Sequence, residues 1–217
     1  FYGLETDGIY QTGDTTIGNA QAGDVRFVDQ NGDGVIDLTD RKVIGNPNPD
    51  YTFGINLSVR YKAFSLSALI NGVYGNDIIN GNLIQMGNAE GLFRNILSDA
   101  YHGAWRPERQ SNTYPRIGYI PSQGQPEFFA TTDRYVEDGS YLRLNNITLG
   151  FDLPIVENNA IKSANIYVTG QNLLTLTNYS GFDPEITSFM WTGLINGVDW
   201  NGPPNSRNIL IGLNINL

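Results

Sequence analysis

Acidic and amide side chains recur at alternate positions in the stretch VDQNGDGVIDLTDR, which covers residues 28–41. Alternate positions on a flexible loop can direct their oxygens toward one centre, and Ca²⁺ binds about six to eight oxygens of this kind. Gly34 permits the sharp turn that such a loop needs. The sequence therefore predicts a structural calcium ion. The candidate ligands are the side chains of Asp29, Asn31, Asp33, Asp37 and Asp40 and the backbone carbonyl of Val35.

The spacing of these residues follows the EF-hand calcium loop, with Asp29 at its first position and Gly34 at its sixth. Asp40 stands at the twelfth position, where EF-hands usually carry the longer Glu. The preceding residues, GDVRFV, have strand character, so we expect no helix to enter the loop. The pattern indicates an isolated calcium loop like those of extracellular modules. The alternative is a solvated turn, rich in Asp and Asn, that holds no ion.

The composition excludes several kinds of site. Thirteen basic and twenty-two acidic residues give a net charge of −9. This charge argues against nucleic acid as a partner, because nucleic-acid binding depends on basic surface. The chain has no Cys, which excludes disulfides, thiolate zinc sites and Cys nucleophiles. His102 is the only histidine of the chain, so metal sites built from several histidines are excluded.

Asp183 and Glu185 form the one acid pair that could suggest an enzyme, since many glycosidases use two carboxyl groups about 5 Å apart. The two acids flank Pro184 in the glycine-containing segment GFDPEI. Acids in such a segment are better explained as caps of a turn. We therefore expect no enzymatic activity.

Strict alternation of apolar and polar residues predicts five strands, each about as long as a tilted strand that crosses a bilayer. Their expected ranges are 52–61, 64–74, 140–153, 164–176 and 207–217. The first two fit a hairpin around Lys62-Ala63 in which Tyr61 faces Phe64 and Val59 faces Leu66, with one apolar and one largely polar face. Lys-Ala lacks the Asn or Gly that a two-residue turn prefers.

The connections between these strands alternate in length. Residues 62–63 and 154–163 are short, whereas 75–139 and 177–206 are long, and residues 1–51 form a further loop region that carries the acidic stretch. Short turns on one side and long loops on the other are typical of antiparallel outer-membrane β-barrels. The alternative is a secreted, calcium-dependent carbohydrate-binding β-sandwich, whose apolar faces would meet in a core. No run of apolar residues is long enough for a transmembrane helix.

Four segments, in the same order, resemble the late barrel region of SusC/RagA-type TonB-dependent outer-membrane transporters. They are GDVRFVDQNGDGVIDLTDRKVIGNPNPDYTFGINLSVRYKAFSLSALINGVYGN (23–76), WRPERQSNTYPR (105–116), RYVEDGSYLRLNNITLGFDLP (134–154) and YVTGQNLLTLTNYSGFDPEI (167–186). The resemblance implies an all-β fold in which this chain supplies the C-terminal strands of a 22-stranded antiparallel barrel. It also implies long extracellular loops and contact with outer-membrane lipid.

The resemblance further implies uptake of oligosaccharides or peptides through the outer membrane of Bacteroidota. A SusD-like surface lipoprotein would cover the barrel as a lid. TonB would supply energy through a segment upstream of this chain.

Two sets of side chains could then serve transport. Arg60 and Arg143 lie at polar positions of strands and are candidates for the barrel lumen. Aromatic rings in the long loops could stack on sugars or contact the lid, and the alternative is that they pack the loops against one another. These rings belong to Trp105, Tyr114, Tyr179, Trp191 and Trp200. Apolar residues at helical spacing in segment 90–105 predict a short helix there.

Overall fold

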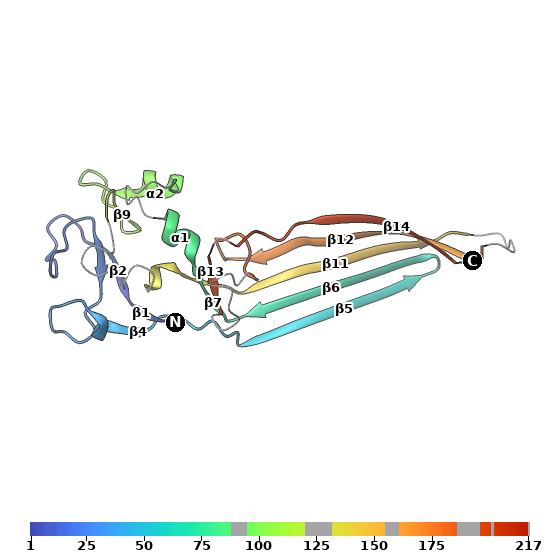
Figure 1. The fold of residues 1–217 in the computed structure, drawn as a ribbon, viewed down its shortest axis with the longest axis horizontal. Helices are drawn as coiled ribbons and strands as arrows, with labels where there is room; N and C mark the ends of the chain where they lie inside the picture. The colour runs from blue at the N-terminus through green and yellow to red at the C-terminus, as the bar shows by residue number, and fades with distance from the viewer. Residues whose placement is uncertain (88–94, 120–131, 155–160, 186–195, 201, 217) are drawn as a thin grey trace. The chain divides into compact units, whose positions relative to one another are not determined.

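The computed structural model describes residues 1–87, 95–119, 132–154, 161–185, 196–200 and 202–216. Strands dominate these ranges, with a few short helical turns (Figure 1). The chain divides into two compact units, which we describe separately. Unit 1 comprises Phe1–Asn48, Asp77–Asp138 and Ile186–Gly202, and unit 2 comprises Pro49–Asn76, Gly139–Glu185 and Pro203–Leu217. No helix in the described ranges is long and apolar enough to cross a membrane.

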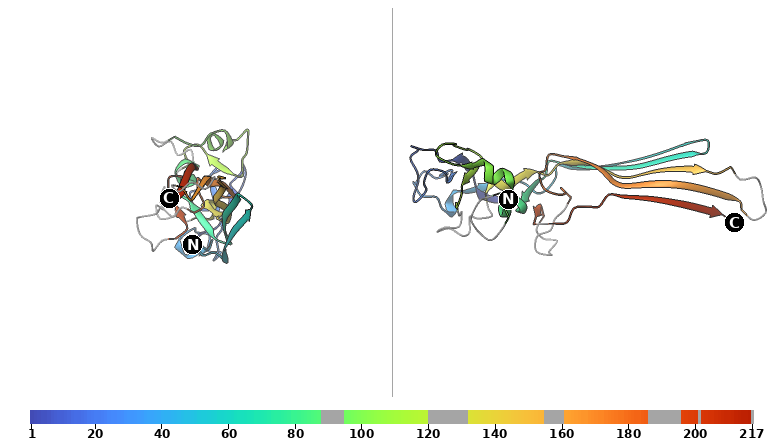
Figure 2. Two further views of the ribbon diagram at one scale, coloured as in Figure 1. Left: turned by 90° about the vertical axis from the view of Figure 1, so that its right-hand side faces the viewer. Right: turned by 90° about the horizontal axis from the view of Figure 1, so that it is seen from above.

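Unit 2 is built on one five-stranded sheet in the order β14-β12-β11-β6-β5. All four neighbouring pairs are antiparallel, and the strands run side by side in Figure 1 and in the right-hand view of Figure 2. Their bounds are β5 (Tyr51–Tyr61), β6 (Phe64–Tyr74), β11 (Tyr141–Asp152), β12 (Ser163–Thr177) and β14 (Asn208–Asn216). Each strand is long enough to cross the apolar part of a bilayer when tilted.

The β5–β6 hairpin has the predicted register. Tyr61 pairs with Phe64 and Val59 pairs with Leu66, so the apolar residues of both strands share one face. The turn places Lys62 at φ +53°. This left-handed conformation costs a non-glycine residue about 1–2 kcal/mol. The sequence was therefore right about the pairing in spite of an unfavourable turn residue.

A bulge in β11 determines which residues share the polar face. The pairing of β11 with β6 and β12 shifts between Leu144 and Asn146. Because side chains alternate along a strand, one extra residue reverses the faces beyond it. Arg143 thus pairs with Asn71 and lies on the same face as Gly150, which pairs with Ser65.

The opposite face of the sheet is apolar and exposed. Phe64, Leu149 and Ile211 are 61%, 59% and 74% exposed, and they come from three different strands. Water-facing surfaces of soluble proteins rarely carry contiguous apolar patches of this kind. The face is typical of a sheet that contacts lipid rather than of one half of a sandwich core.

Unit 1 consists of short strands and turns drawn from three separate parts of the chain. The antiparallel pairs are β1 (Tyr2–Leu4) with β4 (Arg41–Val43) and β2 (Thr6–Ile9) with β3 (Val25–Phe27). β8 (Ala104–Trp105) runs parallel to β9 (Tyr114–Arg116). β7 (Asp77–Asn80) lies between antiparallel β10 (Val136–Asp138) and parallel β13 (Val198–Asp199). The short helical elements are η1 (Leu38–Asp40), α1 (Gly81–Met86), α2 (Ser98–Gly103) and η3 (Asp133–Tyr135).

Much of what the sequence indicated as long loops is therefore ordered structure. A small core of Ile9, Val25, Trp105 and Tyr119 holds part of unit 1 together. Part of the helix predicted in segment 90–105 falls on residues 90–94, which lie outside the described residues. In the described part, α2 begins at Ser98, because Leu97 before it has an extended conformation. Tyr101 on that helix is 48% exposed, and its ring has a local contact with the ring of His102, with centroids 5.3 Å apart.

Candidate functional site

The acidic loop is organised by hydrogen bonds from its own backbone. The carboxylate of Asp29 accepts the N–H groups of Gly32 and Gly34, at 2.7 and 2.8 Å. Both glycines have positive φ, which lets the chain curl around this carboxylate. Asp33 accepts the N–H of Val35 at 2.8 Å. The loop thus turns tightly around carboxylates.

Asp40 closes the loop. Its two carboxylate oxygens accept the N–H groups of Gln30 and Asp37, at 2.9 and 2.8 Å, and the residue is fully buried. Asp37 in turn caps η1 by accepting the N–H and the hydroxyl of Thr39. The structure thus shows Asp40 as a cap that joins the two ends of the predicted calcium loop.

Hydrogen bonding favours the charged form of two loop carboxyls. The backbone N–H of Gly34 is the main cause that lowers the pKa of Asp29. The Thr39 side chain has the same effect on the pKa of Asp37. Ionised carboxylates are the form that binds Ca²⁺, so this part of the donor set suits the ion. Among the described residues, however, no three acids or histidines converge into a group that could hold a metal.

Among the described residues of unit 2, Arg143 is the most enclosed charged group, with 2% of its side chain exposed. Its guanidinium donates to Asp183 and to Glu185, each at 2.5 Å, and its Nε donates to the hydroxyl of Thr175 at 3.1 Å. The guanidinium carbon also lies 5.3 Å from the centre of the Tyr141 ring. Arg143, a predicted lumen residue, is therefore buried, and its ion pairs hold the residues that follow β12 against β11.

The same contacts revise the interpretation of Asp183 and Glu185 as caps of a turn. Asp183 does accept the N–H of Glu185 at 2.9 Å, which is a turn contact. The main role of both acids is to neutralise Arg143. The sequence offered one signal for this: Arg143 is the only cation of its strand, and a buried cation needs acidic partners nearby.

Arg60, the second lumen candidate, lies on the same polar face but near the short turns. Its guanidinium forms an ion pair with Asp152 while remaining 70% exposed. Asp152 also accepts the side-chain N–H of Asn165 at 2.8 Å. Together with Asn214, these residues line a polar recess of about 640 Å³. A polar surface here suits a water-filled or protein-filled barrel interior.

The aromatic loop candidates pack against glycines. Four of these rings each lie against a glycine, so closely that a Cβ atom on that glycine would come within 2.4–2.6 Å of a ring atom. The pairs are Trp105 over Gly23, Tyr114 over Gly103, Tyr179 over Gly181 and Trp200 over Gly81. Trp105 and Tyr179 are also buried, so their rings hold the loops together. Trp191 lies outside the described residues.

One ion pair of unit 1 went unnoticed in the sequence. Arg116 donates to the carboxylate of Asp24 at 2.7 Å, and Asp24 is 7% exposed. Trp105 lies in the adjoining core and donates its indole N–H to Gln11 at 3.0 Å. No local pattern links these residues, since Asp24 and Arg116 are far apart in the chain.

Comparison with known proteins identifies the family. No family model matches the chain. TonB-dependent receptor P3 of Formosa agariphila is 35% identical over 227 residues, covering 99% of this chain and 22% of that protein. TonB-dependent receptor SusC of Bacteroides thetaiotaomicron is 29% identical, covering 87% and 17%. The chain belongs to the SusC/RagA family of TonB-dependent transporters.

Solved structures agree with this assignment. The RagAB peptide transporter matches with a TM-score of 0.78 and 26% identity, covering 99% of this chain and 22% of that chain. The RagAB peptide importer in its open-open state matches with a TM-score of 0.76 and 27% identity, with the same coverage. This SusC/RagA-type chain is thus a protein of the bacterial outer membrane. It spans about a fifth of the length of the relatives that it matches.

Proposed function

We propose that the chain is part of a TonB-dependent importer that takes up oligosaccharides or peptides across the outer membrane. The observation that carries this proposal is the match to TonB-dependent receptors along 99% of the chain. The exposed apolar face of the five-stranded sheet supports it, because that face suits a lipid-facing barrel wall. The strands would be the C-terminal ones of a barrel of about 22 strands. Unit 1 would belong to the extracellular loops.

The proposed partners follow from the family. A SusD-like lipoprotein would cover the extracellular side, and the RagAB complexes to which the chain is similar support such a two-protein importer. TonB would energise uptake through another part of the protein. We propose no catalysis, because the relatives are receptors and transporters and the Asp183–Glu185 acid pair is occupied by Arg143.

Uptake by whole cells tests this proposal. Cells that carry or lack the gene are given fluorescently labelled oligosaccharides and, separately, labelled peptides, with and without a protonophore that removes the energy for TonB. We expect uptake of one cargo class that requires both the gene and the proton gradient. Uptake that is equal in the two strains for both cargo classes would contradict the importer.

We also propose that the acidic loop binds one structural Ca²⁺. The EF-hand-like spacing of the loop supports this, together with the tight turn that the loop makes around the Asp29 carboxylate. Calorimetry with CaCl₂ on the wild type should show one binding event, with a dissociation constant of about 10⁻⁴–10⁻³ M. Asp33→Ala should abolish it. The control is Glu108→Ala, which removes an exposed acid outside the loop. Equal heats for the wild type and Asp33→Ala would end the proposal.

A further inference from the structure

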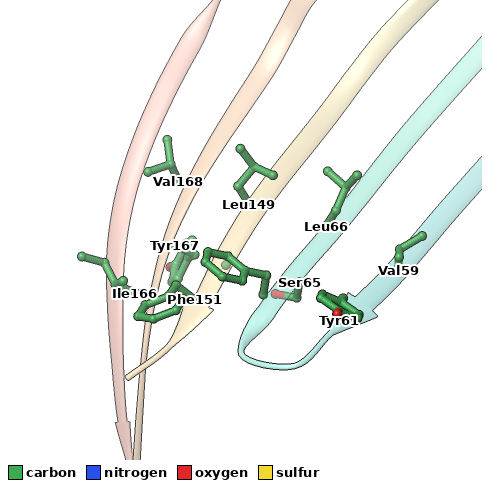
Figure 3. A pocket seen from close by; sticks show the side chains of 11 residues that line it. Val59, Tyr61, Ser65, Leu66, Leu149, Phe151, Ile166, Tyr167 and Val168 are labelled. Carbon is green, nitrogen blue, oxygen red and sulfur yellow. The ribbon is translucent and has the colours of Figure 1, made fainter. Parts of the chain in front are cut away.

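The apolar face of the sheet carries a hollow next to the β5–β6 turn. Its volume is about 370 Å³, within the range of about 300–1,000 Å³ for pockets that hold small ligands. Strands β5, β6, β11 and β12 all contribute to it, as Figure 3 shows. The hollow therefore crosses the sheet rather than following one strand.

Two rows of side chains form the walls of this hollow. One row is aliphatic, and the register places its members opposite one another: Val59, Leu66, Leu149 and Val168. The other row is mostly aromatic and lies nearer the turn: Tyr61, Phe64, Phe151 and Ile166. The rings of Phe64 and Phe151 are in contact, with centroids 4.8 Å apart.

Between the two rows the strands present their backbone. Ser65, Gly150 and Tyr167 pair with one another across the sheet and line the hollow. They alternate with the wall residues along each strand, so Ser65 and Tyr167 direct their side chains to the opposite face. The floor is thus narrow and the walls are hydrocarbon. Such a groove fits a flexible apolar chain better than a polar ligand.

A cation stands at the turn end of the hollow. The Lys62 ammonium lies 5.3 Å from the centre of the Tyr61 ring, and Tyr61 is one of the wall residues. Lys62 adopts a left-handed conformation that Gly or Asn would adopt with less strain. Residues kept in such conformations often serve a function. A hydrocarbon groove with an ammonium group beside one of its wall residues matches a lipid with a negatively charged phosphate.

We propose that the hollow binds one phospholipid of the outer membrane, with an acyl chain between the two rows and the phosphate beside Lys62. Two observations favour this occupant. The hollow is continuous with the exposed apolar face, which contacts lipid, and the aromatic row lies at the turn, where barrels place rings at the level of the headgroups. The inference depends on the outer-membrane location and not on import, so it can fail while the proposed function stands.

Filling the hollow tests the acyl-chain part of the proposal. The complete protein is purified in detergent and titrated with dioleoyl-phosphatidylglycerol, and native mass spectrometry counts the lipids bound to each molecule. Leu149→Trp should occupy the hollow and weaken binding of the tightest lipid at least five-fold. The matched control is Ile211→Trp, because Ile211 pairs with Val168 in the aliphatic row but lies outside the hollow. Equal binding by the wild type and Leu149→Trp would overturn the proposal, as would equal losses in both variants.

Removing the cation tests the phosphate part. Lys62→Gln should weaken the same binding by about five-fold, the size expected for one basic residue near an anionic lipid surface, and Lys62→Arg should retain it. The matched control is Lys162→Gln, which removes the same charge beside the polar recess on the other face. If Lys62→Gln binds the lipid as tightly as the wild type, the headgroup does not bind at Lys62 and the proposed site is wrong.

Discussion

Arg143 shows how a single residue can fix the polar face of this sheet. A guanidinium that is 2% exposed pays a large desolvation cost. Asp183, Glu185 and Thr175 compensate for that cost by accepting its hydrogen bonds. Because the two acids follow β12 while Arg143 lies in β11, the cluster also holds the chain after β12 against the sheet. The residue is thus better described as an anchor than as a free lining group.

Replacing Arg143 should therefore be far more damaging than replacing the exposed arginine of the same face. Arg143→Met leaves two carboxylates without their partner and should lower the free energy of unfolding by about 3–5 kcal/mol. Arg60→Met breaks a pair that is largely exposed and should cost less than about 1 kcal/mol. Urea unfolding of the complete protein in lipid vesicles measures both values. Equal losses would show that the Arg143 cluster is not the anchor described above.

The same cluster should make stability depend on pH. Burial raises the pKa of Asp183, but hydrogen bonds from Arg143 and from the N–H of Glu185 outweigh it, so the pKa lies below its ordinary value of 3.8. A carboxyl with a lowered pKa stabilises the fold above its unfolded pKa and loses that effect as pH falls through the folded value.

The free energy of unfolding of the wild type should thus decrease as the pH falls below about 4, the range in which an aspartate of the unfolded chain takes up its proton. Asp183→Asn, which cannot ionise, should show a smaller decrease over that range. Urea unfolding at a series of pH values measures both curves. Parallel curves for the two proteins would contradict the prediction.

At the scale of elements, the sequence was most informative where side chains alternate. The pairing of Tyr61 with Phe64 could be predicted because only one register places every apolar residue of the hairpin on one face. The bulge beside Leu144 could not be predicted, because the sequence Leu-Asn-Asn carries no signal for an extra residue in a strand. Strand β3 was predicted, because GDVRFV has strand character. The other strands of unit 1 were missed, because two to four residues are too few to show alternation. For Trp105 the sequence left loop packing and a lid or sugar contact open, because the exposure of a ring depends on distant partners; the structure shows it buried.

A charge introduced on β5 should destabilise the protein on one face of the strand and not on the other. Leu57→Arg places a cation at the centre of the strand on the apolar face and should destabilise the membrane-embedded protein by about 2–4 kcal/mol. Ser58→Arg places the same cation one residue further along, on the polar face, and should have little effect. The yield of folded protein in outer membranes and urea unfolding in vesicles measure the difference. Similar losses for both variants would contradict a lipid-facing apolar face.

At the scale of the whole molecule, the chain combines two kinds of folding information. The sheet of unit 2 is encoded locally by alternation and hairpin turns. Unit 1 assembles from Phe1–Asn48, Asp77–Asp138 and Ile186–Gly202, and β7 pairs with β13 from a distant part of the sequence. Such pairings follow from tertiary contacts that no local pattern reveals. Loops organised in this way can present a defined surface, as the proposed extracellular role requires.

Closure of the barrel provides the last prediction. In the described part of the chain, β5 and β14 are the edge strands and each pairs with one neighbour, whereas β11 pairs on both sides. A closed barrel has no edges, so both edge strands would gain a partner in the complete protein. Hydrogen exchange of the membrane-embedded protein should then protect peptides from β5 and β14 as strongly as those from β11. Fast exchange of alternate amides in β5 and β14, beside a protected β11, would indicate an open sheet and contradict the barrel.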